Sequence, residues 1–257
     1  MSALTIVKIG GNVINNPVKL EGFLNDFSKI SGNKILVYGG GREATELSGQ
    51  IGLETKLIDG RRVTDKATLD LVTMVYAGLI NKRIVLQLQN CGCDAVGLTG
   101  ADGASIPATR RDAVPIDYGY VGDINPANVN TRFIASLMDE ATVPVFCAIC
   151  YEKGGSLLNC NADSVASALA KAFASEADVR LVYCLEKPGV LTDVDDVNSL
   201  IPEITAESFS TLVDEGKITG GMIPKVSNAL QAVASGVKEV RICEAGNLLS
   251  ALGTVIR

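Results

Sequence analysis

The chain of 257 residues contains no histidine. Imidazole is the side chain whose ordinary pKa best suits proton transfer at neutral pH, and it is a common zinc ligand. Any reaction of this protein therefore proceeds without an imidazole base, and we expect no metal held by the protein's own side chains.

Long apolar runs are also missing. No stretch approaches the roughly 18 consecutive apolar residues that span a bilayer, and the first residues do not resemble a signal peptide. The seven cysteines follow no disulfide-like spacing. We therefore expect a protein of the reducing cytoplasm that does not act at a membrane.

Positive charge is in deficit, because 23 lysines and arginines face 29 aspartates and glutamates, for a net charge of −6. Non-specific nucleic-acid binding needs the opposite balance, so we exclude nucleic acid as a partner. An acidic protein that handles anions has to concentrate positive charge locally. Each lysine or arginine flanked by glycine therefore gains weight as a site candidate.

Cys147 and Cys150 have the C-x-x-C spacing found in redox and zinc motifs. Both belong to an apolar run that reads as a buried strand over 143–149. Residues three apart on a strand point to opposite faces. We interpret these cysteines as packing residues.

Short apolar runs alternate with longer helical patterns, and hydrophobic residues make up 47% of the chain. This alternation predicts an α/β fold with a mainly parallel sheet covered on both faces by helices, and ligands at the carboxyl ends of its strands. The expected strands are 4–9, 34–38, 95–98, 143–149, 179–184 and 238–243. The expected helices are 17–31, 42–51, 65–90 (with Gly78 as a candidate break), 130–140, 162–175, 206–215 and 221–235.

Residues 101–130 differ from the rest, because glycines and prolines there separate short β-prone pieces. We expect a surface hairpin that serves as a lid or an interface flap. The polar stretch 175–178 reads as a hinge. It would divide an N-terminal lobe, residues 1–175, from a C-terminal lobe, residues 176–257, although one sheet could run through both.

Two lysines accompany glycines at opposite ends of the chain. Lys8 closes an apolar run and precedes Gly10-Gly11, and Lys225 follows Gly220-Gly221. Glycine lets the backbone approach an anion closely, and lysine supplies a compact point charge. Both segments are therefore candidate binding sites for a polyphosphate or another dense anion.

Gly39-Gly40-Gly41 joins an expected strand to an expected helix. Unpaired N–H groups at a helix start favour a phosphate or carboxylate. The segment matches neither the P-loop nor the dinucleotide-binding pattern. A tight turn with close helix–strand packing is an equally good interpretation.

Three further polar side chains lie next to expected helix starts. Arg62 precedes Thr64-Asp65, and a guanidinium can bind a carboxylate through two parallel hydrogen bonds. Asn159 and Asp163 lie close to the start of the helix 162–175, where ordinary capping is the alternative interpretation. Together with the lysines and glycines, they indicate phosphoryl transfer, which depends mainly on positioning and charge neutralisation.

The order of these segments resembles that of the N-acetyl-L-glutamate kinases, a branch of the amino acid kinase superfamily. The resemblance covers nearly the whole chain. The lysine–glycine start is shared across the superfamily, whereas the Arg-Val-Thr and Asn-x-Asn-Ala-Asp segments single out the N-acylglutamate branch. The matching segments are Lys8-Ile9-Gly10-Gly11-Asn12, Gly39-Gly40-Gly41, Arg62-Val63-Thr64-Asp65, Asn159-Cys160-Asn161-Ala162-Asp163 and Gly221-Met222-Ile223-Pro224-Lys225-Val226.

The resemblance implies an open three-layer sandwich that transfers the γ-phosphate of ATP, brought with Mg²⁺, to the side-chain carboxylate of an N-acyl-L-glutamate in arginine synthesis. It implies that Lys8 and Lys225 stabilise the transferring group and that Asp163 orients both lysines. Residues implied to bind substrate are Gly11, Gly40, Gly41, Arg62 and Asn159. Residues implied to bind the nucleotide are Gly10, Glu186, Lys187, Pro188, Gly189, Val190, Leu191, Lys217, Ile218 and Thr219.

The missing histidine is consistent with this reaction. A glutamate side chain has an ordinary pKa near 4.3, so the nucleophile is already ionised at neutral pH and needs no general base. The chain also lacks, ahead of its first expected strand, the helical extension of the arginine-inhibited hexameric members. The resemblance therefore implies a homodimer without arginine feedback.

Some residues depart from the family pattern. Tyr38 replaces a customary histidine, Arg61 a customary apolar residue, and Glu186 a typical aspartate. Tyr38 and Arg61, with Arg110 and Arg111 of the flap, lead to the hypothesis of a bulkier and more anionic acyl group such as N-succinyl. A superfamily kinase for another carboxylate or a carbamate, and a non-catalytic regulatory homologue, are further alternatives. The presence of Lys8, Asp163 and Lys225 argues against the regulatory homologue.

Overall fold

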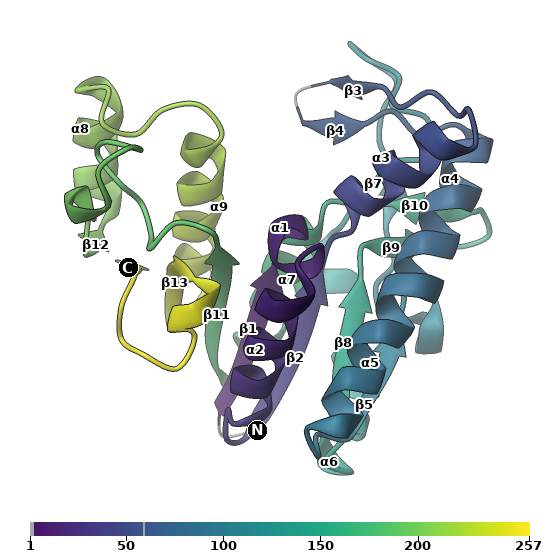
Figure 1. The fold of residues 1–257 in the computed structure, drawn as a ribbon, viewed down its shortest axis with the longest axis horizontal. Helices are drawn as coiled ribbons and strands as arrows, with labels where there is room; N and C mark the ends of the chain where they lie inside the picture. The colour runs from purple at the N-terminus through teal and green to yellow at the C-terminus, as the bar shows by residue number, and fades with distance from the viewer. Residues whose placement is uncertain (1–2, 59) are drawn as a thin grey trace.

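An eight-stranded sheet with the order β12-β14-β13-β11-β1-β2-β8-β5 organises the computed structural model, which describes residues 3–58 and 60–257 (Figure 1). Neighbouring strands are parallel except for β13 and β14, which pair antiparallel. The strands are β1 (Ala3–Ile9), β2 (Asn33–Tyr38), β5 (Ala95–Leu98), β8 (Val143–Cys147), β11 (Asp178–Leu185), β12 (Glu203–Ile204), β13 (Glu239–Glu244) and β14 (Thr254–Ile256).

Three two-stranded ribbons accompany the main sheet. They are β3 (Leu57–Ile58) with β4 (Arg61–Arg62), β6 (Thr109–Arg110) with β7 (Gly122–Asp123), and β9 (Ile149–Tyr151) with β10 (Leu157–Asn159). All three are antiparallel. The predicted mainly parallel sheet is confirmed, whereas the ribbons β3–β4 and β9–β10 and the strands β12 and β14 were not expected.

Helices cover both faces of the sheet (Figure 1). They are α1 (Gly11–Ile14), α2 (Pro17–Ser28), α3 (Gly41–Gln50), α4 (Lys66–Thr73), α5 (Asn81–Asn90), α6 (Thr131–Asp139), α7 (Ala162–Phe173), α8 (Ala206–Asp214) and α9 (Met222–Ala234). Short 3₁₀ turns are η2 (Asp102–Ala104), η3 (Pro126–Asn128), η4 (Val197–Ser199) and η5 (Ala245–Asn247), and η1 (Met74–Ile80) is a π-helix. No helix among the described residues is long and apolar enough to cross a bilayer.

Two apolar cores follow from the alternation of side chains along each strand. Leu4 and Ile6 of β1 join the core under α6, α7 and α9, whereas Val7 and Ile9 join the core under α2 and α5. Cys150 lies in the first core and Cys147 in the second. The packing role predicted for these two cysteines is therefore confirmed.

Local signals fixed several helix starts correctly. Pro17 occupies the first turn of α2, and Asn161 caps α7 by accepting from the N–H groups of Asp163 and Ser164. Asp65 caps α4 in the same way. The expected helices 17–31 and 162–175 end earlier, at Ser28 and Phe173.

The predicted helix over 65–90 has no break at Gly78. It continues through α4, the π-helical segment η1 and α5. The expected strand 143–149 instead divides, because β8 ends at Cys147 and β9 begins at Ile149. Ala148 at the division lines the cavity described below.

The segment 101–130 contains the expected hairpin, with β6 and β7 as its strands. The part of this segment around residues 118–120 is attached to the rest of the molecule by backbone hydrogen bonds. Thr64 N–H donates to Tyr118 O at 2.8 Å, and Asn159 N–H donates to Tyr120 O at 2.9 Å. The flap therefore forms one wall beside the residues that bear the predicted chemistry.

Candidate active site

Two lysines and one aspartate from distant parts of the chain meet near the carboxyl ends of the central strands. Lys8 lies next to the last residue of β1, Asp163 in the first turn of α7, and Lys225 in the first turn of α9. Lys8 Nζ lies 2.7 Å from Asp163 Oδ1, and Lys225 Nζ lies 2.6 Å from Asp163 Oδ2. One carboxylate therefore bridges both ammonium groups.

This cluster of two lysines and one aspartate has an excess of positive charge in a site that is largely shielded from solvent. The side chains of Lys8, Lys225 and Asp163 are 11%, 16% and 25% exposed. Burial by itself raises the pKa of Asp163. The charges and hydrogen bonds of Lys8 and Lys225 together outweigh this effect and lower the pKa to about 2. The carboxylate is therefore ionised at neutral pH, and the cluster carries a net charge of about +1 that favours an anion.

The ring of Tyr183 packs against the ammonium group of Lys225 and limits the positions that it can adopt. Its ring centroid lies 5.3 Å from Lys225 Nζ, within the range of a cation–π interaction. Tyr183 is 1% exposed and lies on β11 in register with Lys8 of β1. The two neighbouring strands therefore supply one lysine and the support of the other.

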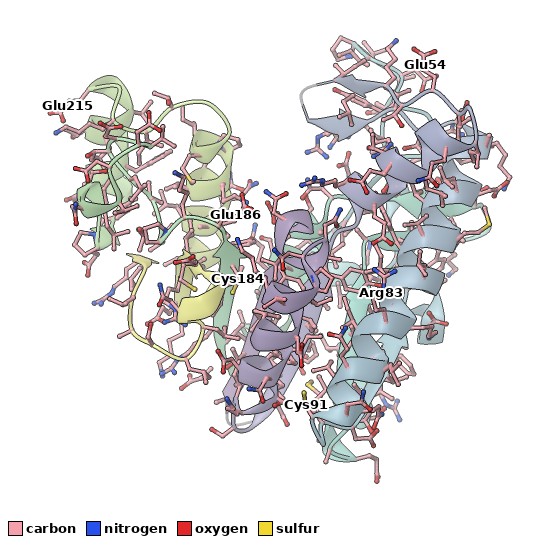
Figure 2. The ribbon with its side chains drawn as sticks, in the orientation of Figure 1. Glu54, Arg83, Cys91, Cys184, Glu186 and Glu215 are labelled. Carbon is pink, nitrogen blue, oxygen red and sulfur yellow. The ribbon has the colours of Figure 1, made fainter. Side chains whose placement is uncertain are left out.

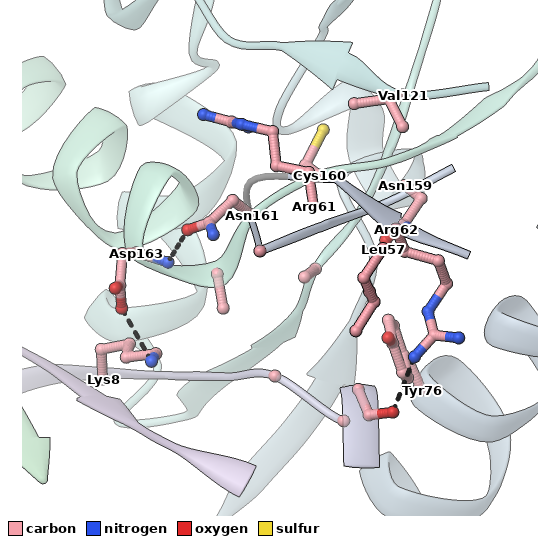
Figure 3. Close-up of a pocket in the computed structure, with 16 residues that line it drawn as sticks. Lys8, Leu57, Arg61, Arg62, Tyr76, Val121, Asn159, Cys160, Asn161 and Asp163 are labelled. Atoms are coloured by element: carbon pink, nitrogen blue, oxygen red, sulfur yellow. Dashed lines mark hydrogen bonds and ion pairs between the residues drawn. The ribbon is translucent and has the colours of Figure 1, made fainter. Parts of the chain in front are cut away.

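A cavity of about 210 Å³ opens beside Lys8 and Asp163 (Figure 3). Its wall combines glycine backbone, cationic side chains and amides with a few apolar groups. Such a lining suits a small polar anion better than a flat aromatic ligand. The lining residues are Lys8, Gly39, Gly40, Gly41, Leu57, Gly60, Arg61, Arg62, Tyr76, Val121, Ala148, Asn159, Cys160, Asn161, Ala162 and Asp163.

Arg62 is held rigidly at one end of this cavity. It is 8% exposed, and its Nη2 donates to Gly41 O at 2.8 Å and to Thr45 Oγ1 at 2.7 Å. Its Nη1 donates to Thr55 Oγ1 at 3.1 Å. A guanidinium has five N–H groups, so these bonds fix the fork while two donors stay available to a ligand.

Thr64 connects the two predicted substrate residues. Asn159 Nδ2 donates to Thr64 Oγ1 at 3.0 Å, and Thr64 Oγ1 donates to Arg62 O at 2.8 Å. Thr64 is fully buried. These two hydrogen bonds order Asn159 and Arg62 together.

The glycine turns serve two purposes. A Cβ on Gly40 would lie 2.6 Å from both Ile80 Cδ1 and Tyr76 Cδ1, so close packing requires glycine there. This supports the packing interpretation of the triple glycine, although the partner is η1 and not a strand. Gly10 and Gly11 begin α1, whose first N–H groups have no intrahelical acceptor. A Cβ on Gly10 would meet no atom within 4 Å.

The segments predicted to bind nucleotide follow β11 and precede α9. Figure 2 shows Glu186 at the carboxyl end of β11. Glu186, Lys187, Lys217 and Thr219 are exposed, and Pro188 and Leu191 are half-buried. None of them lines the 210 Å³ cavity, so they form a second surface on the other side of the two lysines.

Three residues of these segments cannot contact a nucleotide through their side chains. Val190 is fully buried, its N–H donates to Thr254 Oγ1 at 2.8 Å, and its carbonyl accepts from Ile201 N–H. Ile218 is 2% exposed, and Gly189 packs against Leu200 and Thr254. They shape the loops from inside, and their role in nucleotide binding stays a prediction.

The structure also corrects the argument for a bulkier acyl group. Tyr38 is fully buried, and its Oη donates to Tyr76 O at 2.7 Å outside the cavity. Arg110 donates to Gly119 O at 2.8 Å, and Arg111 forms an ion pair with Asp123. Arg61 lines the cavity, and it is the one residue of that argument that does so among the described residues.

Some cavity residues were not identified from the sequence. Tyr76 lies inside a long helical pattern and reads there as a core aromatic. Leu57 and Val121 lie in segments without a local motif. Thr64 orders Arg62 and Asn159 without lining the cavity, and its place beside Arg62 was a signal that we read as part of a helix start.

Comparison with known proteins identifies the family of the chain. The family model "Amino acid kinase family" matches residues 3–244. The chain belongs to the amino acid kinase family. Members of known structure share its fold: a carbamate kinase from Giardia lamblia is 17% identical, with a TM-score of 0.71 over 99% of this chain and 98% of that chain.

More similar proteins narrow the branch. The acetylglutamate kinase of Phocaeicola vulgatus is 49% identical over 254 residues, which are 99% of this chain and 98% of the relative. The acetylglutamate kinase of Bacteroides thetaiotaomicron is 46% identical over the same share of each. The crystal structure of smu.665 from Streptococcus mutans is 31% identical, with a TM-score of 0.79 over 98% of each chain.

Proposed function

We propose that this protein is an acetylglutamate kinase, which phosphorylates the side-chain carboxylate of N-acetyl-L-glutamate with ATP in arginine biosynthesis. The observation that carries the proposal is the Lys8–Asp163–Lys225 bridge beside a small cavity that contains Arg62 and Asn159. The acetylglutamate kinases of similar sequence support the same substrate.

The acceptor binds in the cavity. Arg62 binds its α-carboxylate with the two N–H groups that its internal bonds leave available, and Asn159 binds the neighbouring amide. The backbone of Gly11, Gly40 and Gly41 completes the binding surface. The side-chain carboxylate then points toward Lys8, where it arrives ionised and ready to attack.

Phosphoryl transfer needs charge neutralisation and little else. A carboxylate oxygen forms a bond to the γ-phosphorus, the bond to the bridging oxygen of ADP breaks, and no proton has to move. Lys8 and Lys225 stabilise the charge on the transferring group from the acceptor side and the donor side, while Asp163 keeps both in place.

Magnesium enters with the nucleotide as MgATP. Asp163 is the only carboxylate among the described residues that line the cavity, and two ammonium groups already neutralise it. It is therefore a poor metal ligand, and the phosphate oxygens hold the ion.

The two lobes divide these tasks. The N-terminal lobe, residues 1–175, binds the acylglutamate. The C-terminal lobe, residues 176–257, binds ATP with the exposed residues of 186–191 and 217–219, and Gly10 of the N-terminal lobe also contacts the nucleotide. The continuous sheet joins them at the β1–β11 pair. Lys8 and Lys225 come from different lobes, so the catalytic cluster forms at their junction.

A hydroxylamine trap tests the reaction directly. Purified protein, MgATP and a panel of N-acetylglutamate, N-succinylglutamate, aspartate and carbamate are incubated, and the acyl phosphate is captured as hydroxamate. We expect the highest kcat/KM for N-acetylglutamate. A clear preference for another acceptor overturns the substrate, and no turnover with any acceptor overturns the proposed activity.

We further propose a homodimer in the cytoplasm. Met74, Leu79 and Leu86 expose 62%, 49% and 61% of their surfaces along the helix run α4–η1–α5. Exposed apolar side chains of this kind suit a contact between subunits. The cysteines are all free, which suits the reducing environment of the cytoplasm. Light scattering should give a dimer, and Leu86→Glu should give a monomer. A dimer that survives this change contradicts the assigned face.

A further inference from the structure

The wall of the acceptor cavity opposite Asp163 contains a phenol that no motif predicts. Tyr76 lies in the π-helical segment η1, is 4% exposed and lines the cavity beside Arg62 (Figure 3). π-helical turns within longer helices are rare and frequently occur at functional sites. The position of Tyr76 is therefore a candidate for a specific task in the reaction.

Tyr76 and Arg62 lie beside the same glycine of the turn. A Cβ built on Gly41 would lie 3.8 Å from Tyr76 Oη and 3.8 Å from Arg62 Nη2. The ring of Tyr76 also covers Gly40, where a Cβ would lie 2.6 Å from Tyr76 Cδ1. The glycine turn, the guanidinium and the phenol thus enclose the same end of the cavity.

The position of the phenol is fixed from behind. Tyr38 Oη donates to the backbone carbonyl of Tyr76 at 2.7 Å, and Tyr38 is fully buried. Burial raises the pKa of the Tyr76 phenol, although the neighbouring Arg62 opposes this shift. Tyr76 therefore keeps its proton at neutral pH and is a hydrogen-bond donor in a rigid place.

We infer that Tyr76 is a specificity-determining residue whose hydroxyl donates a hydrogen bond to the same α-carboxylate of the acceptor that Arg62 binds. Tyr38 acts through it as a positioning residue, because it fixes the backbone of η1. This inference rests on the proposed function, and it gives Tyr38 a role at the substrate site although Tyr38 does not line the cavity.

Tyr76→Phe removes the hydroxyl and keeps the ring. We expect the KM for N-acetylglutamate to rise about tenfold, as for loss of a hydrogen bond to a charged group, while the KM for ATP stays within about twofold. Tyr151→Phe, at a tyrosine outside the cavity, is the matched control. Wild-type protein without activity on N-acetylglutamate would refute the proposed function, whereas an active wild type with an unchanged Tyr76→Phe KM refutes only this inference.

A substrate without the α-carboxylate separates contact from structure. 4-Acetamidobutanoate keeps the reacting carboxylate, so the wild type and Tyr76→Phe should have equal KM values for it. An equal rise for both acceptors would show that the substitution distorts the cavity, and it would overturn the inference. Combining Tyr76→Phe with Arg62→Lys should cost less than the product of the single effects, because both groups bind one carboxylate.

A measurement on the wild type covers the case in which Tyr76→Phe folds poorly. The protein has six tyrosines, and labelling their ζ carbons with ¹³C gives six phenol resonances. Phe replacements of the other five assign the sixth to Tyr76. N-acetylglutamate should shift this resonance and 4-acetamidobutanoate should not. Equal shifts with both compounds contradict the inference.

Discussion

The two sides of Lys8 and Lys225, which we propose as the acceptor side and the donor side of the reaction, are built differently. On the acceptor side, Arg62, Thr64 and Asn159 are nearly buried and connected by hydrogen bonds into one rigid cavity wall. On the donor side, Glu186, Lys187 and Lys217 are exposed on loops. The contrast lies within one continuous sheet.

This difference follows from what each side has to recognise. A small acceptor offers few atoms, so its selection depends on donors that are already in place. ATP offers three phosphates and a large base, so exposed loops can bind it with many weaker contacts. We expect substitutions to be costly at the lysine cluster and in the cavity, and mild on the nucleotide loops.

Lys8→Arg should have the largest effect. A planar fork cannot replace a point charge beside a crowded phosphoryl group, and we expect kcat to fall about 10²- to 10³-fold. Lys238→Arg, at an exposed ion pair with Asp178, is the matched control and should keep its turnover. Steady-state kinetics with both substrates saturating decide, and near-normal turnover of Lys8→Arg would remove Lys8 from the mechanism.

Asp163→Asn tests the bridge through the pH dependence of stability. The pKa of Asp163 is about 2 in the folded protein, against 3.8 as its ordinary value. A lowered pKa stabilises the fold by about 2 kcal/mol above pH 4, and this contribution disappears as the pH falls through about 2. Urea unfolding should therefore show a gap between wild type and Asp163→Asn at pH 7 that narrows between pH 4 and pH 2.

The exposed pair of Asp178 and Lys238 supplies the control for this titration. Asp178→Asn should change stability less than Asp163→Asn at pH 7. If the difference in the free energy of unfolding between wild type and Asp163→Asn stays constant down to pH 2, the contribution of Asp163 to stability does not depend on its charge.

Gly40→Ala tests the rigidity of the acceptor side. The new Cβ would meet Tyr76 and Ile80 at 2.6 Å, and such overpacking costs about 1–3 kcal/mol. We expect a lower Tm and a higher KM for the acceptor. Gly49→Ala in the same helix α3 meets no atom within 4 Å and should keep or raise the Tm. Equal Tm changes in the two variants would contradict close packing at Gly40.

Lys217→Ala should have the smallest effect. Lys217 is 49% exposed and pairs with Glu215 at 2.7 Å on the surface. We expect the KM for ATP to rise a few-fold and the free energy of unfolding to stay within about 0.5 kcal/mol. A change in the acceptor KM as large as that in the ATP KM would break the division of tasks between the two sides.

Much of the fold could be predicted because its signals are local. The β-strands, the helices and the caps at Asp65 and Asn161 depend on residues a few positions apart. The antiparallel strand β14 and the ribbon β9–β10 were missed, because short strands acquire their partners only in the folded chain. The helix over 65–90 was predicted as one segment, whereas the candidate break at Gly78 is absent, because packing against neighbours and not the propensity of glycine decides the conformation there.

The site divides in the same way. Arg62 and Asn159 line the cavity as the resemblance implied, because their motifs place them beside strand and helix ends. The burial of Val190 and Ile218 could not be predicted, because a loop sequence does not say which side chains turn inward. Tyr76 was missed, because a helical pattern does not show which aromatic faces a cavity and which faces the core.

The sequence by itself determined the α/β fold, the glycine turns beside Lys8 and Lys225, and the exclusion of imidazole chemistry. Only the tertiary structure decided the geometry, in which Lys8 and Lys225 lie 2.7 and 2.6 Å from the carboxylate of Asp163 and in which Tyr76 and Arg62 lie beside Gly41. The physical reason is the separation along the chain between the residues that interact. Turns, caps and periodicity depend on neighbours along the chain, whereas the meeting of distant charges depends on how the helices pack on the sheet.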